Sequence, residues 1–271
     1  MSPLLDPEGF PLFSLADINR LPMPAKESIY RQLIPEELFV RFGIDRDNLR
    51  GSDGDRKVRF LCPAGLGVLR IEVRLRPTDA DCLFFVEIAD TPYGQVELSF
   101  CLVNDPASPR FNVDRDEAGR DNCFGTLRRN LEAEKQAMAA GLAPHQVRRG
   151  MRLFAPFFRH LEQLVAALGV SSIVAEPLSY DNAVRYEGYG FDYLTGKQLM
   201  LSIDREFRPG GALWKRLDDS TPFRRRGMEK TVRGRSWAIH DGILEHPWDG
   251  VRIYKIPGLN AGINTFSEPR E

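Results

Sequence analysis

The sequence is poor in the residues that build disulfide frameworks and metal sites. It has four cysteines and four histidines in 271 residues. No two cysteines form a CxxC pair, and no two histidines form an HxH or HxxxH pair. No GxSxG or P-loop pattern is present either. We therefore expect buried free thiols and no metal site.

Long apolar runs and an excess of one charge sign are also missing. No stretch approaches the roughly 18 apolar residues of a membrane-spanning helix, and the first residues lack the basic and then apolar layout of a signal peptide. The net charge is −1 and the pI about 6.5, so no overall field attracts nucleic acid or anionic lipid. These absences predict a cytoplasmic protein with no membrane span and no nucleic-acid partner.

The sequence does have clear changes of hydrophobic period. Residues 1–50 contain two stretches of helical period, "PAKESIYRQL" and "PEELFVRFGI", each opening with proline. From Arg56 the period becomes two, in "RKVRFLC", "GVLRIEVRLR", "CLFFVEIAD" and "GQVELSFCLV". Short turn-rich segments separate these runs, which predicts an antiparallel meander of four strands.

A helical insertion follows, at about residues 104–145. It consists of a charged connection and a helix in "TLRRNLEAEKQAMAAGL" that ends at Gly141. A second, amphipathic helix then ends at Gly169. Its buried face is predicted from Phe154, Phe157, Phe158, Leu161, Leu164, Val165 and Leu168.

A buried strand in "SSIVAEP" comes next. Because strand–helix–strand crossovers join parallel strands, residues 172–176 should run parallel to residues 96–103. A short helix begins near Ser179, and further strands are predicted in "KQLMLSIDREF", "SWAIHDGILE" and "VRIYKI". The element order predicts an α/β (α+β) fold with a mixed central sheet flanked by helices. Residues 1–207 are predicted to form the main domain, and residues 208–271 a C-terminal extension that packs on it.

The short helix carries a motif of its own. Tyr186, Glu187, Gly190 and Phe191 match the Tyr-Glu-x-x-Gly-Phe signature of GNAT-type acyl-CoA N-acyltransferases. Gly150 precedes Gly190 at the spacing that separates the phosphate-loop glycine from the signature glycine in that family. From about residue 95 to residue 207 the chain resembles this family, so we expect a GNAT-like fold. Gly190 is expected to stop the helix, because glycine tolerates positive φ.

The resemblance implies transfer of an acetyl or longer acyl group from a CoA thioester to an amine. By resemblance Tyr186 is the acid that protonates the departing thiolate, although an ordinary core tyrosine explains it equally well. Glu87 and Glu97 are the candidates for the base, and each is otherwise a solvated glutamate on a strand. Such a reaction needs no protein nucleophile, since positioning and proton handling suffice.

The resemblance also implies a site for the donor, acetyl-CoA or another acyl-CoA. The expected binding residues are Arg148, Arg149, Gly150, Met151, Arg152, Ser179 and Asn182. The chain has Val147 and Arg152 where the family loop reads Gln or Arg and Gly or Ala. A basic loop at a helix start favours a diphosphate, and the alternative is a solvated basic turn.

Two further hypotheses stay open. An N-acyltransferase that uses acyl carrier protein as donor needs a pantetheine site but no complete pyrophosphate cradle. A GNAT-like binding or scaffolding protein that has lost catalysis would use the loop arginines for structure. The basic stretch "FRRRGMEKTVRGR" is compatible with binding RNA or acyl carrier protein, and a solvated face is the simpler interpretation, since the stretch has no stacking platform of aromatic residues. The expected acceptor is an amine on a small molecule or a peptide; its identity is not predicted, because acceptor loops vary freely on one scaffold.

Overall fold

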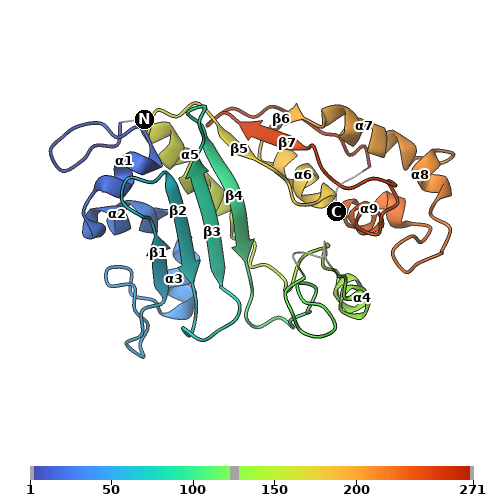
Figure 1. Ribbon diagram of the computed structural model, residues 1–271, viewed down its shortest axis with the longest axis horizontal. Helices are drawn as coiled ribbons and strands as arrows, with labels where there is room; N and C mark the ends of the chain where they lie inside the picture. The colour runs from blue at the N-terminus through green and yellow to red at the C-terminus, as the bar shows by residue number, and fades with distance from the viewer. Residues whose placement is uncertain (1–2, 123–127, 269–271) are drawn as a thin grey trace. The chain divides into compact units, whose positions relative to one another are not determined.

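The computed structural model describes residues 3–122 and 128–268. They form two compact units (Figure 1). The first unit comprises Met1–Pro106, Gly150–Ala175 and Lys255–Leu259, and the second comprises Ala107–Arg149, Glu176–Tyr254 and Asn260–Glu271. The predicted main domain, residues 1–207, and C-terminal extension, residues 208–271, stay predictions.

The first unit contains the predicted meander. Its antiparallel strands are β1 (Val58–Leu61), β2 (Val68–Val73), β3 (Phe84–Asp90) and β4 (Val96–Val103). The fifth strand, β5 (Ile173–Ala175), runs parallel to β4, and the order is β1-β2-β3-β4-β5. Helix α5 (Phe154–Ala167) lies between β4 and β5 in the chain. The predicted parallel pairing is therefore confirmed, and a mixed sheet is present.

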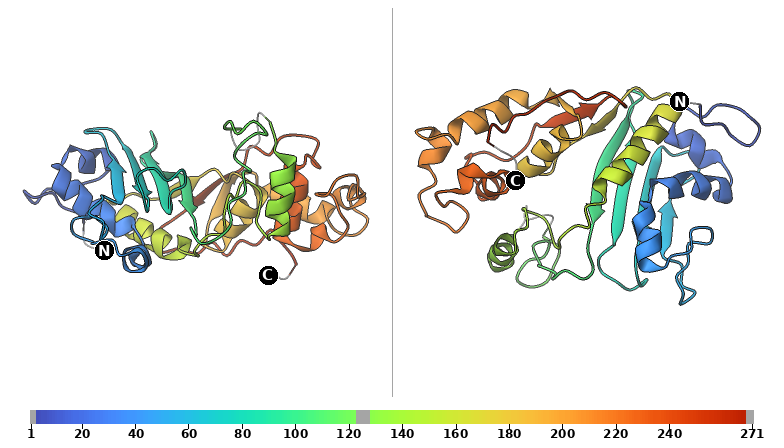
Figure 2. Two further views of the ribbon diagram at one scale, coloured as in Figure 1. Left: turned by 90° about the horizontal axis from the view of Figure 1, so that it is seen from below. Right: turned by 180° about the vertical axis from the view of Figure 1, so that it is seen from behind.

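Helices cover one face of this sheet, as the view from behind in Figure 2 shows. They are α1 (Leu15–Arg20), α2 (Met23–Tyr30), the 3-10 turn η1 (Arg31–Leu33), α3 (Glu36–Phe42) and α5. Alternate strand residues are buried, as the period of two requires: Leu69, Ile71, Val73, Phe84, Val86 and Ile88. The Phe84 ring packs edge-on against Phe157 of α5 at 5.5 Å. Pro156 lies in the first turn of α5, where a missing N–H is tolerated.

The second unit is mainly helical. Its helices are α4 (Leu131–Ala139), α6 (Tyr180–Glu187), α7 (Lys197–Glu206), α8 (Ala212–Lys215), the 3-10 turn η2 (Met228–Lys230) and α9 (Val232–His240). Strand β6 (Asp192–Thr195) pairs antiparallel with β7 (Arg252–Lys255). Trp237 stacks on Phe223 at 5.2 Å, and its indole N–H donates to the Leu142 carbonyl at 2.8 Å. The predicted helix start at Thr126 lies outside the described residues.

Two predicted strands are wrong. The stretch "KQLMLSIDREF" forms α7, in which the buried Met200, Ile203 and Phe207 recur at helical spacing. The stretch "SWAIHDGILE" ends α9 and continues into a turn at Gly242, whose φ is +83°. The predicted strand in "VRIYKI" is confirmed as β7. In α7 burial at three- and four-residue steps fits a helix, whereas α9 buries five consecutive residues, 235–239, so its apolar residues alone do not distinguish a helix from a strand.

Candidate functional site

Strand β4 is irregular where the catalytic chemistry is expected. In its pairing with β3, Glu87 lies opposite Phe100 and Ile88 lies opposite Leu98, so Ser99 is an extra residue, a β-bulge. On the other side, the described ladder with β5 covers only Val96–Ile173 and Glu97–Val174, although β4 continues to Val103. Beyond Glu97, β4 therefore has backbone groups that β5 does not pair.

The two candidate bases lie on neighbouring strands of the first unit. Glu87 on β3 forms an ion pair with Arg70 at 2.7 Å. Glu97 on β4 accepts a weaker hydrogen bond from the Ser99 hydroxyl at 3.3 Å. Both residues are partly buried. The Glu87 carboxylate is thus already held by a guanidinium, whereas that of Glu97 keeps capacity for another donor.

The arginines before Gly150 are bonded to the second unit's own backbone. Arg148 donates from Nη1 to the Ser108 carbonyl at 2.6 Å, and Arg149 donates from Nη2 to the Ala140 carbonyl at 3.0 Å. The Arg149 N–H also donates to Ser108 Oγ at 3.1 Å. These bonds hold the loop, so a structural role accounts for part of the basic cluster.

The other half of the loop belongs to the first unit. A Cβ on Gly150 would lie 3.0 Å from the carbonyl oxygen of Val103, the last residue of β4. This close approach explains why a glycine stands at position 150. Met151 is partly buried and Arg152 is exposed. Arg152 has φ +61°, a left-handed conformation that favours glycine. The backbone at Arg152 therefore adopts a conformation that is uncommon for a non-glycine residue.

The end of α6 explains the signature glycine. Phe191 N donates to the Tyr186 carbonyl at 3.3 Å, and Gly190 N donates to the Glu187 carbonyl at 2.9 Å. With φ +86° at Gly190, these two bonds form a Schellman motif. The Tyr186 ring is partly buried and packs edge-on against Phe191 at 4.9 Å. The predicted glycine stop of the helix is confirmed.

The two polar residues at the start of α6 bind a buried carboxylate. Ser179 Oγ donates to Asp181 Oδ1 at 2.7 Å, and Asn182 Nδ2 lies 3.3 Å from Asp181 Oδ2. The Ser236 hydroxyl of α9 donates to the same Oδ1 at 2.7 Å. Asp181 thus joins α6 to α9. No local sequence pattern indicates this role of Asp181, because its partner Ser236 lies 55 residues along the chain.

The signature glutamate has a structural role that the motif did not reveal. Glu187 is buried, and its Oε1 accepts from the Tyr193 hydroxyl at 2.6 Å and from Thr265 Oγ1 at 2.5 Å. Its Oε2 accepts from Thr265 N at 3.1 Å. Burial, followed by the bond to Glu187, raises the pKa of the Tyr193 hydroxyl. Glu187 therefore fastens the C-terminal segment to α6 and β6.

A third buried carboxylate, that of Glu134, contacts the end of α9. Glu134 of α4 accepts from Arg129 at 2.9 Å and contacts His240 Nε2 at 3.1 Å. Burial opposes ionisation of Glu134, but the bonds to His240 and Arg129 outweigh it and hold the pKa of this carboxyl below its ordinary value. The His145 ring meets the His240 ring edge-on at 4.7 Å, and His145 has φ +68°. These contacts bring four residues together that are separated in the sequence: Arg129, Glu134, His145 and His240.

The predicted site residues divide between the two units. Glu87, Glu97, Gly150, Met151 and Arg152 belong to the first, while Arg148, Arg149, Ser179, Asn182 and Tyr186 belong to the second. Within the first unit the β4 pairings bring Glu97 to Ala89 on one side and Val174 on the other. Within the second unit, Ser179 and Asn182 meet at Asp181. Their assignment to a donor site remains a prediction.

The described residues contain no group of three or more His, Cys, Asp or Glu that could hold a metal ion. Cys62 and Cys82 are buried free thiols, and Cys101 is a partly buried one; Cys123 lies outside the described residues. No helix in the described part of the chain is long and apolar enough to span a membrane. Comparison of the chain with protein-family models, curated proteins and solved structures finds no match.

Proposed function

We propose that this chain is a GNAT-like acyltransferase, which transfers an acetyl or longer acyl group from a CoA thioester to an amine. The observation that carries the proposal is the pairing of β4 with β5, parallel but limited to two residue pairs. Past Glu97, β4 offers backbone groups that an extended pantetheine arm can pair with as an added strand.

The bulge supports a second part of the reaction. At a bulge one residue is left out of the ladder, so the backbone near Ser99 is free to turn an N–H away from β3. An N–H aimed at the thioester carbonyl stabilises the oxyanion that develops when the amine attacks. In this proposal β4 supplies both the surface that binds the donor and the dipole that activates it.

Glu97 is the better of the two candidate bases. It lies beside the bulge, and among the described residues its carboxylate accepts a long hydrogen bond, 3.3 Å, from the Ser99 hydroxyl. Glu87 is engaged by Arg70, so proton uptake there would break an ion pair. In the proposed reaction Glu97 accepts a proton from the amine, directly or through water. Tyr186 stays the candidate, by resemblance alone, for the acid that protonates the departing thiolate.

The engagement of Arg148 and Arg149 with backbone carbonyls favours acyl carrier protein as a second candidate donor. Such a donor presents a pantetheine arm without the nucleotide pyrophosphate, so the loop does not have to bind a diphosphate. Arg152 remains exposed in either case, and a donor phosphate can use it.

Release of free thiol from acetyl-CoA, octanoyl-CoA and acylated carrier protein, measured with a panel of primary amines, tests the proposal. We expect amine-dependent release that falls at least tenfold in Glu97→Gln and in Tyr186→Phe, with donor affinity little changed. Glu87→Gln is the matched control and should retain most activity. Release equal in wild type and both variants would contradict the assigned roles.

A further inference from the structure

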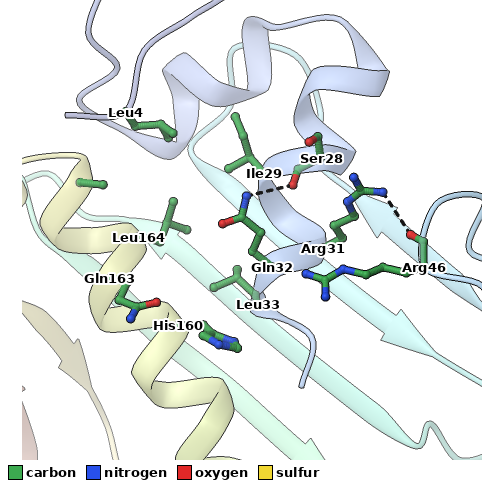
Figure 3. Close-up of a pocket in the computed structure, with 11 residues that line it drawn as sticks. Leu4, Ser28, Ile29, Arg31, Gln32, Leu33, Arg46, His160, Gln163 and Leu164 are labelled. Carbon is green, nitrogen blue, oxygen red and sulfur yellow. Dashed lines mark hydrogen bonds between the residues drawn. The ribbon is translucent and has the colours of Figure 1, made fainter. Parts of the chain in front are cut away.

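The first unit contains a pocket on the helical side of its sheet, shown in Figure 3. Residues of α2, η1 and α5 line it, together with Leu4 and Arg46. Its volume is about 440 Å³, within the roughly 300–1,000 Å³ of small-molecule sites. No part of the proposed acyl-transfer chemistry uses this pocket.

The lining combines positive charge with hydrocarbon. Arg31, Arg46 and His160 line it, and the described lining includes no carboxylate. Figure 3 shows Arg46 extending from its loop toward Leu33, on the side where His160 projects from α5. Leu4, Ile29 and Leu164 gather on the other side. The pocket is therefore polar and basic at one end and apolar at the other.

The carboxylate partners of the two arginines lie in solvent. Arg46 pairs with Glu36, whose side chain is 54% exposed, and Arg31 pairs at 3.2 Å with Asp47, whose side chain is 93% exposed. Exposed pairs of this kind contribute little to stability. Arg31 also donates to the Arg46 carbonyl at 3.1 Å, which fixes the two residues to each other. An anion in the pocket can therefore compete for the Arg46 guanidinium.

His160 supplies an independent sign of a missing partner. Its Nδ1 is buried and makes no hydrogen bond to the described residues. Buried polar atoms are nearly always hydrogen-bonded, so an unpaired ring nitrogen on a residue that lines the pocket indicates that this imidazole can take a further partner. The side-chain amide of Gln32, which also lines the pocket, donates to the Ser28 carbonyl at 3.3 Å.

We propose that this pocket binds a small amphipathic anion. Its carboxylate or phosphate head pairs with Arg46 and hydrogen-bonds His160, and its hydrocarbon body lies on Leu4, Ile29 and Leu164. The guanidinium fork suits either head group, because both present oxygens in bidentate geometry. The apolar end excludes small hydrophilic anions as the preferred ligands, since they leave that surface in contact with water.

Calorimetry with four probes of one chain length tests the proposal: octanoate, octyl phosphate, octanol and octylammonium. We expect both anions to bind at least tenfold more tightly than the alcohol and the ammonium. Whichever anion binds more tightly identifies the head group. Equal affinity for octanoate and octanol, or no binding of either anion at millimolar concentration, would overturn the proposal.

Variants separate binding from folding. Arg46→Ala and His160→Ala should each weaken anion binding at least tenfold, while Arg159→Ala, an exposed neighbour on α5, should not change it. Glu36→Gln removes the competing carboxylate and should tighten binding, an effect that a merely structural Arg46 would not produce. Circular dichroism confirms that each variant is folded. Unchanged affinity in Arg46→Ala and Glu36→Gln would contradict the assigned head-group site.

Discussion

The backbone N–H of Phe191 donates to the carbonyl oxygen of Tyr186 across 3.3 Å, and this bond turns the chain out of α6. The turn requires φ +86° at Gly190, where a Cβ would lie 3.0 Å from Asn260 Cα. Gly190→Ala should therefore lower the free energy of unfolding by about 1–2 kcal/mol, or more if Asn260 cannot move. Urea denaturation measures this change.

Gly188 is the matched control for that substitution. It directly follows the last residue of α6 and has φ −62° and ψ −20°, a right-handed conformation that alanine adopts freely. Gly188→Ala should be neutral or stabilise the protein by up to about 1 kcal/mol. Equal losses in both variants would argue against the left-handed turn.

Glu187 is predicted to act in folding rather than in catalysis. Glu187→Ala leaves three buried donor groups of Tyr193 and Thr265 without their acceptor. At about 1–3 kcal/mol for each unsatisfied group, we expect a loss of about 3 kcal/mol or more. Glu187→Gln keeps the size and one acceptor oxygen and should cost less. Turnover per folded molecule should stay unchanged in Glu187→Gln, and a selective loss of turnover would make this residue catalytic.

The ion pair between Arg235 and Asp204 is the most deeply buried one described in the second unit. Their side chains are 1% and 7% exposed and lie 2.7 Å apart, and the Arg235 guanidinium stacks on Phe266 at 4.5 Å. Arg235→Leu should destabilise the fold by about 3–5 kcal/mol, because it leaves a buried carboxylate with less compensation. Arg208, which is 57% exposed, binds the same carboxylate from outside. Arg208→Ala should cost less than about 1 kcal/mol, and chemical denaturation of both variants compares the two.

Asp204 also predicts how stability depends on pH. Burial opposes its ionisation, but hydrogen bonds from Arg235, Arg208 and Ser267 outweigh burial and lower the pKa from 3.8 to about 2. A carboxyl whose pKa is lowered by folding stabilises the protein above its unfolded pKa, and this contribution disappears as the pH falls through the folded pKa. The stability difference between wild type and Asp204→Asn should therefore shrink by about 2 kcal/mol between pH 5 and pH 2. A difference that is constant over this range would contradict the assigned pKa.

The meander and the crossover were predictable because burial on one face imposes a period of two on strands and a period of 3.6 on helices. Strands β1 to β4 and helix α5 follow these periods closely. Helix α7 was not predicted, since Leu199, Met200, Leu201 and Ile203 also suit a strand. The choice depends on which of them is buried. Met200 and Ile203 are buried while Leu201 is 42% exposed, and this pattern becomes known only from the packing.

The candidate site was less predictable than the fold. The motif indicated the Gly190 stop, because that requirement is local. The partners of Asp181 and Glu187 lie at Ser236 and Thr265, so no local pattern could reveal them. The bulge at Ser99 was equally hidden, because it depends on the register between two strands rather than on either strand's composition.

Donor binding tests the central claim most directly. Thermal unfolding should be recorded with acetyl-CoA, octanoyl-CoA and holo-acyl carrier protein at concentrations far above the expected dissociation constants. At a thousandfold excess over the dissociation constant, a true donor stabilises the folded state by about 4 kcal/mol, which shifts the melting temperature by several degrees. We predict such a shift with at least one pantetheine donor and none with ATP. No shift with any pantetheine donor, or an equal shift with ATP, would contradict the account.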